Sequence, residues 1–260
     1  MNMNIRLFGI IFCFIATATG CALPPPMPSV EPNFVFTPPS SVSATHSKMA
    51  IAILQPVYGG DLFADPLFSN VKTTFDEMLK AAHSDIEKIL IARGFTTAGA
   101  YPTIDEMTYS QKQRASLILR STFNLEISVN SSGGFSPSTA TMRGSVSLDF
   151  LEPMSREKVW LKRLELAPIT KTVKIDTVMV GQKPLELQPG QKKISLADLV
   201  GVNRGGQVVQ VIAKNSMNDL LNTFYASALE KIWNQLDARE IKSLKQDADK
   251  LKHTTQYRGG

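Results

Sequence analysis

Two long runs in the middle of the chain, residues 115–129 and 142–150, alternate between apolar and polar side chains. Alternation with a period of two is typical of antiparallel strands that bury one face and expose the other. Between them, Asn130-Ser-Ser-Gly-Gly134 predicts a flexible tip. We therefore expect antiparallel pairing here. In the first run the apolar positions are Leu117, Leu119, Phe123, Leu125, Ile127 and Val129, and the polar positions are Arg120, Asn124, Glu126 and Ser128.

Helical periodicity precedes and follows these runs. Asp65 and Pro66 have the character of an N-cap and a first helical residue, and Gly94 that of a left-handed cap at the helix end. An apolar stripe with helical spacing lies between these two ends, and a second one runs over residues 212–236. A polar extension over residues 239–252 continues this stripe with thinner apolar spacing.

Further strands complete the prediction of the fold. Residues 49–54 form a continuous apolar run typical of a buried strand, and residues 159–166 and 173–180 alternate again. The order is strand, helix, strand meander, helix. It predicts an α+β fold, with an antiparallel sheet and two main helices packed on one of its faces.

Cys21 lies at the end of a short apolar run and directly before a proline-rich stretch. The apolar run over residues 5–16 is shorter than the about 20 residues that span a bilayer, and with its small-residue exit it is typical of a secretory signal. Ala18-Thr-Gly-Cys21 fits the lipobox pattern, although Leu is commoner than Ala at its first position. We expect a lipoprotein signal peptide over residues 1–20 and lipidation of Cys21, palmitate included. The alternative is an ordinary signal peptide with an incidental Cys.

The residues around this site have three consequences. Ala22, rather than the Asp that retains many lipoproteins in the inner membrane, follows Cys21, so we expect the outer membrane. Cys13 leaves with the signal, so no disulfide forms within one mature chain and the fold rests on its hydrophobic core. Arg6 is also removed with the signal peptide. The mature chain would then have 27 basic and 23 acidic residues, a net charge of +4. This charge is interspersed, so no nucleic-acid partner is expected.

Residues 21–47 are rich in proline, with seven of the 15 prolines of the chain. Proline favours extended polyproline II geometry, so we expect a lipidated, disordered tether over 21–47 and a single α+β domain with a C-terminal helical extension over 48–260. Phe34-Val-Phe36 interrupts the tether. This apolar triplet is either solvated with the rest or docked on the domain or the bilayer.

Catalytic and metal-binding patterns are absent from the sequence. His46, His83 and His253 are far apart and have no second ligand at metal spacing. The chain has neither a Gly-x-Ser-x-Gly elbow nor a Gly-Lys-Ser/Thr phosphate loop. Asp105-Glu106 is better explained as a solvated helix start than as an acid–base pair. We expect no enzyme activity, no cofactor and no metal.

Five segments spread along the chain carry a resemblance to a known family. They are Ala52-Ile-Leu-Gln-Pro56, Ile91-Ala-Arg-Gly-Phe95, Phe150-Leu-Glu-Pro-Met-Ser155, Ala228-Leu-Glu-Lys-Ile-Trp233 and Leu244-Lys-Gln-Asp-Ala-Asp-Lys-Leu-Lys252. Together with the lipobox they resemble the neuraminyllactose-binding haemagglutinin family, also called flagellar sheath adhesins or lipoproteins. The resemblance implies an outer-membrane or flagellar-sheath lipoprotein that adheres to host sialylated glycans.

The sequence departs from this family at one important place. The best-known member carries a Lys/Arg-rich stretch, once proposed as the sialyl-binding motif, where this chain has residues 131–140 without any basic residue. Arg143 lies just beyond them. A sialic acid carboxylate is best bound by Arg or Lys, so no glycan-binding residue is carried over. The alternative is a structural envelope or sheath lipoprotein that acts through protein contacts, with an exposed apolar patch on residues 239–252.

Overall fold

A long antiparallel hairpin forms the centre of the computed structural model, which describes residues 30–39, 49–65, 68, 71–130, 138–180 and 207–256. Its two strands are β4 (Leu117–Asn130) and β5 (Ser138–Leu151), paired without interruption from Ile118↔Leu151 to Asn130↔Thr139. The predicted alternation is confirmed. Apolar side chains of both strands enter the main core, whereas the polar ones lie on the opposite face.

The expectation of an antiparallel sheet is wrong, because the sheet is mixed. Its order is β3-β1-β4-β5-β6, and β1 pairs in parallel with both β3 and β4. A helix between β1 and β3 returns the chain to the same end of the sheet, so the next strand runs in the same direction. The remaining strands of this sheet are β1 (Ala50–Leu54), β2 (Val57–Tyr58, parallel to β4), β3 (Thr96–Tyr101), β6 (Lys158–Glu165) and β7 (Ile169–Val173, antiparallel to β5).

The first strand also explains why the sequence there lacks alternation. Ile51 and Ile53 lie in the main core, whereas Ala52 and Leu54 lie in a smaller cluster on the other face. The short elements η3 (Ile104–Glu106) and α2 (Tyr109–Arg114) follow β3 and contribute to this smaller cluster with the residues around them. A strand buried on both faces is apolar throughout, which is typical of parallel pairing.

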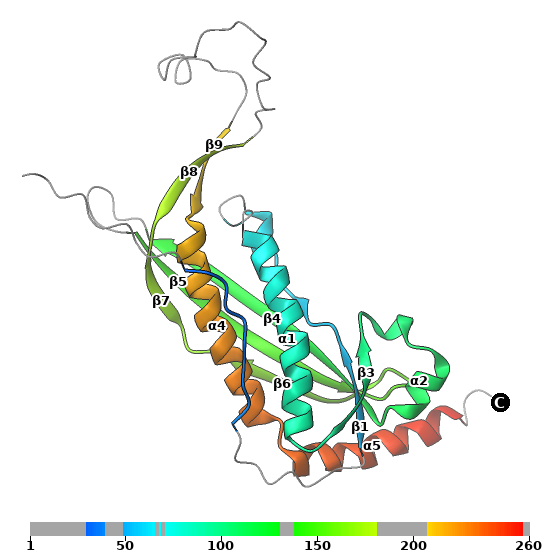
Figure 1. The fold of residues 1–260 in the computed structure, drawn as a ribbon. Helices are drawn as coiled ribbons and strands as arrows, with labels where there is room; N and C mark the ends of the chain where they lie inside the picture. Colours follow the sequence, from blue (N-terminus) through cyan, green and yellow to red (C-terminus); the bar gives the residue numbers. More distant parts are fainter. Residues whose placement is uncertain are drawn as a thin grey trace, which may run out of the picture.

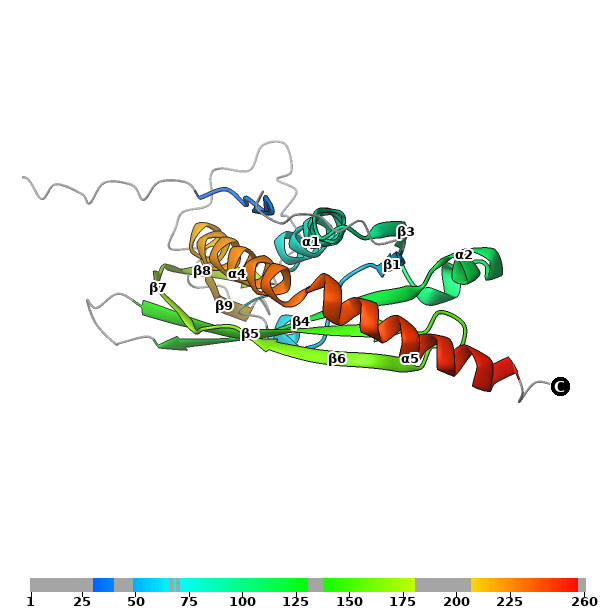
Figure 2. The same cartoon turned by 90° about the horizontal axis from the view of Figure 1, so that it is seen from below.

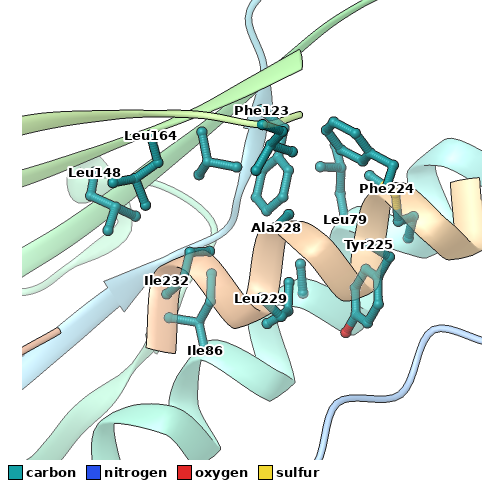
Figure 3. Packing of buried hydrophobic residues seen from close by; sticks show 14 of the residues in the cluster. Leu79, Ile86, Phe123, Leu148, Leu164, Phe224, Tyr225, Ala228, Leu229 and Ile232 are labelled. Carbon is teal, nitrogen blue, oxygen red and sulfur yellow. The ribbon is translucent and has the colours of Figure 1, made fainter. Parts of the chain in front are cut away.

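Two long helices, α1 (Lys72–Ala92) and α4 (Lys214–Gln235), lie side by side on one face of the sheet (Figures 1 and 2). Their apolar stripes meet the inner side chains of β4, β5 and β6. Figure 3 shows this core, in which Ala228 and Ile232 of α4 lie between the strands and Ile86 of α1. Fully buried Phe123, Phe150 and Phe224 are among its largest members.

Of the two predicted ends of the first helix, the start is wrong and the C-terminal cap is confirmed. The helix begins at Lys72 with Val71 as its N-cap, so the predicted start at Asp65 is wrong. Asp65 instead ends a short 3-10 turn, η1 (Leu62–Ala64). The predicted left-handed cap is confirmed, because Gly94 has a φ of 86° and the next amide, Phe95 N, donates to Leu90 O at 3.0 Å.

The polar C-terminal extension is the helix α5 (Ala238–Gln256), which follows α4 after a short break. Its apolar residues Ile241, Leu244 and Ala248 are buried and belong to the main core. The exposed apolar patch expected on residues 239–252 is therefore not formed by these residues. At the break, the Arg93 guanidinium lies 3.9 Å from the ring centre of Trp233 and joins the end of α1 to the end of α4.

A separate two-stranded ribbon, β8 (Ile175–Val180) with β9 (Gln207–Ile212), leads into α4 (Figure 1). Ile212 ends this strand rather than starting the helical stripe. No helix within the described ranges is both long and apolar enough to cross a membrane.

Part of the expected tether lies on the domain. Phe34 and Phe36 pack against the main core, and residues 30–39 run along the helices on the side away from the sheet (Figure 2). For Phe34 and Phe36 the structure thus shows docking on the domain, one of the two alternatives, whereas Val35 between them is exposed. The rest of the tether, including Cys21, lies outside the described residues.

Candidate functional site

The polar face of the sheet carries a pocket of about 410 Å³. It lies where the loop after β2 passes strands β4, β5 and β6. Strong pairing and sheet twist hold these strands, so the side chains that line the pocket come from a rigid surface. The lining residues are Gly59, Gly60, Asp61, Asn124, Leu125, Glu126, Arg143, Gly144, Ser145, Arg163 and Glu165.

Strand register brings the polar groups of the pocket together. Glu126 faces Arg143 across β4 and β5, and Asn124 faces Ser145. Ser145 in turn faces Glu165 of β6. Directly opposed side chains are close enough to act on one ligand. The pocket therefore presents carboxylate, amide, hydroxyl and guanidinium groups from three neighbouring strands.

The loop after β2 closes one side of the pocket. Gly59 N donates to Phe123 O at 3.0 Å, which holds the loop against β4. A Cβ at Gly59 would lie 2.3 Å from Asn124 Oδ1, so a residue without a side chain is required for this approach.

Tyr58 fixes the same loop from the core side. Its hydroxyl accepts a hydrogen bond from Leu62 N at 3.0 Å and donates to Leu125 O at 3.4 Å. Burial raises the pKa of this phenol, with a further contribution from the nearby Asp61 and Glu126 carboxylates. At neutral pH the hydroxyl is protonated, as its hydrogen bond to Leu125 O requires.

The two arginines of the pocket differ in their partners. Arg163 Nε donates to Glu165 Oε1 at 2.5 Å. Arg143 is exposed and has no hydrogen bond or ion pair with any side chain in the described part of the chain. A free guanidinium offers two parallel N–H donors that match a carboxylate. Arg143 is thus the group in this pocket best suited to an anionic ligand.

Ser145 has an unusual position in the pocket. Its side chain is 1 % exposed, and its Oγ has no hydrogen-bond partner among the described residues. A buried hydroxyl without a partner is unfavourable, and this Oγ is shielded from solvent at the wall of the pocket. The set of groups suits a ligand that carries both an acid group and several hydroxyls.

A second polar cluster lies further along the same face. Arg120 Nε donates to Asp149 Oδ2 at 3.0 Å, and Lys158 Nζ lies 3.5 Å from the same oxygen. The Asp149 side chain is only 7 % exposed. Its charge is compensated by two cations, so this cluster stabilises the sheet rather than presenting a free charge.

The residues singled out from sequence are distributed as follows. Cys21 and most of the stretch over 131–140 lie outside the described residues, and Arg143, noted only as the next basic residue, lines the pocket. His83 lies on α1, and no group of three metal-ligating side chains occurs in the described ranges. The expectations of no enzyme activity, no cofactor and no metal stay predictions.

Sequence reasoning missed most of the pocket. The alternation correctly places Asn124 and Glu126 on the polar face of a strand, but nothing in the sequence marks that face as a site. The signal that could have drawn attention is Gly59-Gly60 directly after a strand, since paired glycines permit close approach of a backbone. Which strands that loop would approach could not be read from the sequence.

Comparison with known proteins shows the fold but no sequence family. No family model and no curated protein match the chain. Among solved structures, a candidate neuraminyllactose-binding haemagglutinin homologue from Helicobacter pylori is similar, with a TM-score of 0.53 and 13% identity over 85% of this chain and 100% of that one. At this identity the likeness shows a distant fold relationship alone.

Two further solved structures are less similar to this chain. A protein from Xanthomonas campestris has a TM-score of 0.35 and 9% identity, over 84% of this chain and 97% of that one. A lipoprotein from Neisseria meningitidis has a TM-score of 0.23 and 14% identity, over 48% of this chain and 83% of that one. These scores are too low to bear on function.

Proposed function

We propose that this protein is a lipid-anchored protein of the outer membrane or flagellar sheath that binds acidic, sialylated glycans of a host through the pocket on its polar sheet face. The observation that carries the proposal is the unpaired Arg143 in a pocket that also holds Ser145, Asn124 and three carboxylates. A guanidinium binds the sugar carboxylate, and the other groups accept or donate hydrogen bonds to its hydroxyls.

Two further observations support the proposal. The fold resembles that of a neuraminyllactose-binding haemagglutinin homologue, and the lipobox ending in Cys21 supplies the anchor. The role proposed is binding rather than catalysis. The basic stretch of the haemagglutinin family is then not required, since Arg143 takes its place.

The alternative role as a structural envelope protein has lost its specific support. It predicted an exposed apolar patch on the C-terminal extension, and the apolar residues Ile241, Leu244 and Ala248 of α5 are buried in the domain. We therefore do not propose it as a second function.

The test is binding of the chain from Ala22 onward to an array of sialylated and neutral glycans. The protein is displayed multivalently, because avidity raises weak signals by orders of magnitude. We expect selective binding of sialylated glycans. Arg143→Ala removes a hydrogen-bonded charge worth about 1.5–3 kcal/mol, which lowers binding about tenfold or more.

Matched variants locate the site. Arg143→Lys keeps the charge but loses the fork of two donors, so we expect intermediate binding. Lys242→Ala removes an exposed cation from α5, far from the pocket in sequence, and leaves binding unchanged. If the folded wild-type chain bound no glycan, the proposal of glycan binding would be overturned. Equal binding by the wild type and Arg143→Ala would show that the glycan does not bind in this pocket.

A further inference from the structure

Residues 30–39 are held on the domain by a regular pattern of contacts. Along this extended segment the even-numbered side chains are half-buried and the odd-numbered ones are exposed. Such alternation is that of a strand lying on a surface. The segment follows α4 on its outer side, so it forms a third layer over the helices (Figures 1 and 2).

Two asparagines of α4 bind the main chain of the segment. Asn218 Nδ2 donates to Val30 O at 2.7 Å, and Asn222 Nδ2 donates to Glu31 O at 3.0 Å. Asn222 Oδ1 also accepts from Asn33 N at 2.8 Å. The two asparagines are four residues apart and share one face of the helix. Asn218 is 1 % exposed with the segment in place, so its hydrogen bond to Val30 O is shielded from water.

A buried carboxylate of α1 holds the other end of the segment. Asp85 is 3 % exposed, and its Oδ2 accepts from Phe36 N at 2.7 Å and from the Tyr225 hydroxyl at 2.6 Å. Lys88 Nζ lies 2.6 Å from Oδ1 and balances the charge. A buried carboxylate requires several donors, and one of the three here comes from residues 30–39.

Aromatic packing completes the contact. The ring centres of Phe34 and Tyr225 are 5.4 Å apart, and Phe36 packs against the main core. Tyr225 points away from the strands that carry Phe123 and Leu148 in Figure 3, toward the layer that the segment occupies. Polar anchors on both helices and two buried rings therefore fix residues 30–39.

We propose that residues 30–39 act as a brace that holds the domain close to its own lipid anchor, with the N-terminal end of α4 toward the membrane. The proposal rests on the lipidation of Cys21 in the proposed function. Val30 is nine positions after Cys21, a reach of about 28 Å at polyproline II spacing. If residues 30–39 were not docked, β1 would begin 29 positions after the anchor, a reach of about 90 Å.

The point of attachment sets the orientation. Val30 is bound by Asn218, in the second turn of α4. The helix has 22 residues and is about 33 Å long. Its first turns therefore lie within reach of the membrane, and its C-terminal end lies about 26 Å further along the helix from the attachment point.

The test measures energy transfer from two positions on α4 to an acceptor lipid, using the full lipidated chain in vesicles. Cys21 is acylated in the mature chain, so Lys214→Cys and Lys231→Cys, both at exposed sites, each provide one labelled thiol. They lie about 26 Å apart along the helix. We expect transfer from position 214 to exceed that from position 231 about twofold or more, because of this separation.

Undocking variants make the measurement specific. Asn218→Ala/Asn222→Ala removes the anchors on α4, and Phe34→Ser/Phe36→Ser removes the rings from the segment itself, leaving the helices unchanged. In either background the ratio of transfer between the two positions should fall toward one. Val35→Ser is the matched control, since Val35 is 67 % exposed on the outer side of the segment, and it should keep the wild-type ratio.

The outcomes separate the brace from the rest of the proposal. Equal transfer from both positions in the wild type, or a ratio unchanged in the ring variant with folding confirmed by circular dichroism, overturns the brace. Failure of the wild type to float with vesicles overturns the anchor and the orientation with it. A floating chain that binds no glycan leaves the brace standing and overturns glycan binding.

Discussion

At the scale of single residues, Asp85 and Tyr225 form the most buried polar contact between α1 and α4. They are 140 positions apart in sequence, and the Tyr225 hydroxyl donates to Asp85 Oδ2 at 2.6 Å. Tyr225 is 1 % exposed and Asp85 is 3 % exposed. The bond satisfies a carboxylate in the core, and the same Oδ2 atom also accepts a hydrogen bond from Phe36 N.

Tyr225→Phe removes one donor from this buried carboxylate. We expect the free energy of unfolding to fall by about 1–3 kcal/mol, the usual cost of an unsatisfied buried partner. Urea denaturation followed by tryptophan fluorescence measures the change. Tyr109→Phe is the control, because Tyr109 is 65 % exposed on α2. Equal loss in the two variants would show that the buried bond contributes nothing specific.

The same tyrosine gives the protein a dependence on alkaline pH. Burial raises the pKa of Tyr225 above its ordinary value of 10.0, and the hydrogen bond to Asp85 raises it further. The folded state therefore keeps a proton that the unfolded chain loses, so this contribution to stability is complete below pH 10.0 and declines as pH rises above it. Tyr225→Phe should decline less between pH 9 and pH 11 in the same denaturation measurement, and an identical decline would contradict this origin.

At the scale of the elements, the motif Phe150-Leu-Glu-Pro-Met-Ser155, one of the five segments of the family resemblance, is a structural turn. Glu152 is fully buried after β5, and its Oε2 accepts hydrogen bonds from Met154 N at 2.8 Å and Ser155 N at 2.5 Å. Arg156, with a φ of 63°, completes the reversal toward β6. The motif therefore marks how β5 turns into β6, and it says nothing of a ligand.

Contact between α4 and β5 depends on one glycine. A Cβ at Gly144 would lie 2.4 Å from Cε2 of Phe224 and 2.8 Å from the backbone oxygen of Asn124. Gly144→Ala therefore forces the helix away from the sheet, and we expect a loss of about 1–3 kcal/mol in the free energy of unfolding.

Thermal or urea denaturation measures this loss. Ser147→Ala, a substitution on the polar face of the same strand, serves as the control and should stay near the wild type. A Gly144→Ala protein as stable as the wild type would mean that α4 adjusts to the extra methyl group at no cost.

At the scale of the whole molecule, the proposed lipid anchor and the domain are connected by a segment of which residues 30–39 are docked. The lipobox predicts three acyl chains at Cys21, and each buried CH₂ contributes about 0.8 kcal/mol to membrane binding. Stable attachment requires more than one chain. The proposed location of the protein thus depends on a single thiol.

Cys21→Ser should move the protein from the membrane fraction to the soluble fraction and abolish acyl labelling. The reason is that serine lacks the thiol to which the lipid is attached. Cys13→Ser is a control within the same chain, since Cys13 lies in the segment that is removed, and it should keep both membrane attachment and labelling. Retention of both by Cys21→Ser would contradict the lipoprotein prediction.

The sequence by itself determined the elements whose signal is local. The alternation in β4 and β5, the apolar stripes of α1 and α4 and the cap at Gly94 all follow from the spacing of neighbouring residues. The lipobox is also a short linear pattern, although it lies outside the described residues. These predictions needed no knowledge of which segments meet.

Only the tertiary structure decided how distant segments meet. Local spacing does not encode the direction in which β1 pairs with β3 and β4, so the sheet is mixed where an antiparallel one was expected. Phe36 meets Asp85 across 49 residues and Asn33 meets Asn222 across 189, and the loop at Gly59 reaches Arg143 and Arg163 in one pocket. Such contacts form because burial and hydrogen bonding are satisfied over the whole molecule at once, and no periodic pattern in the chain records them.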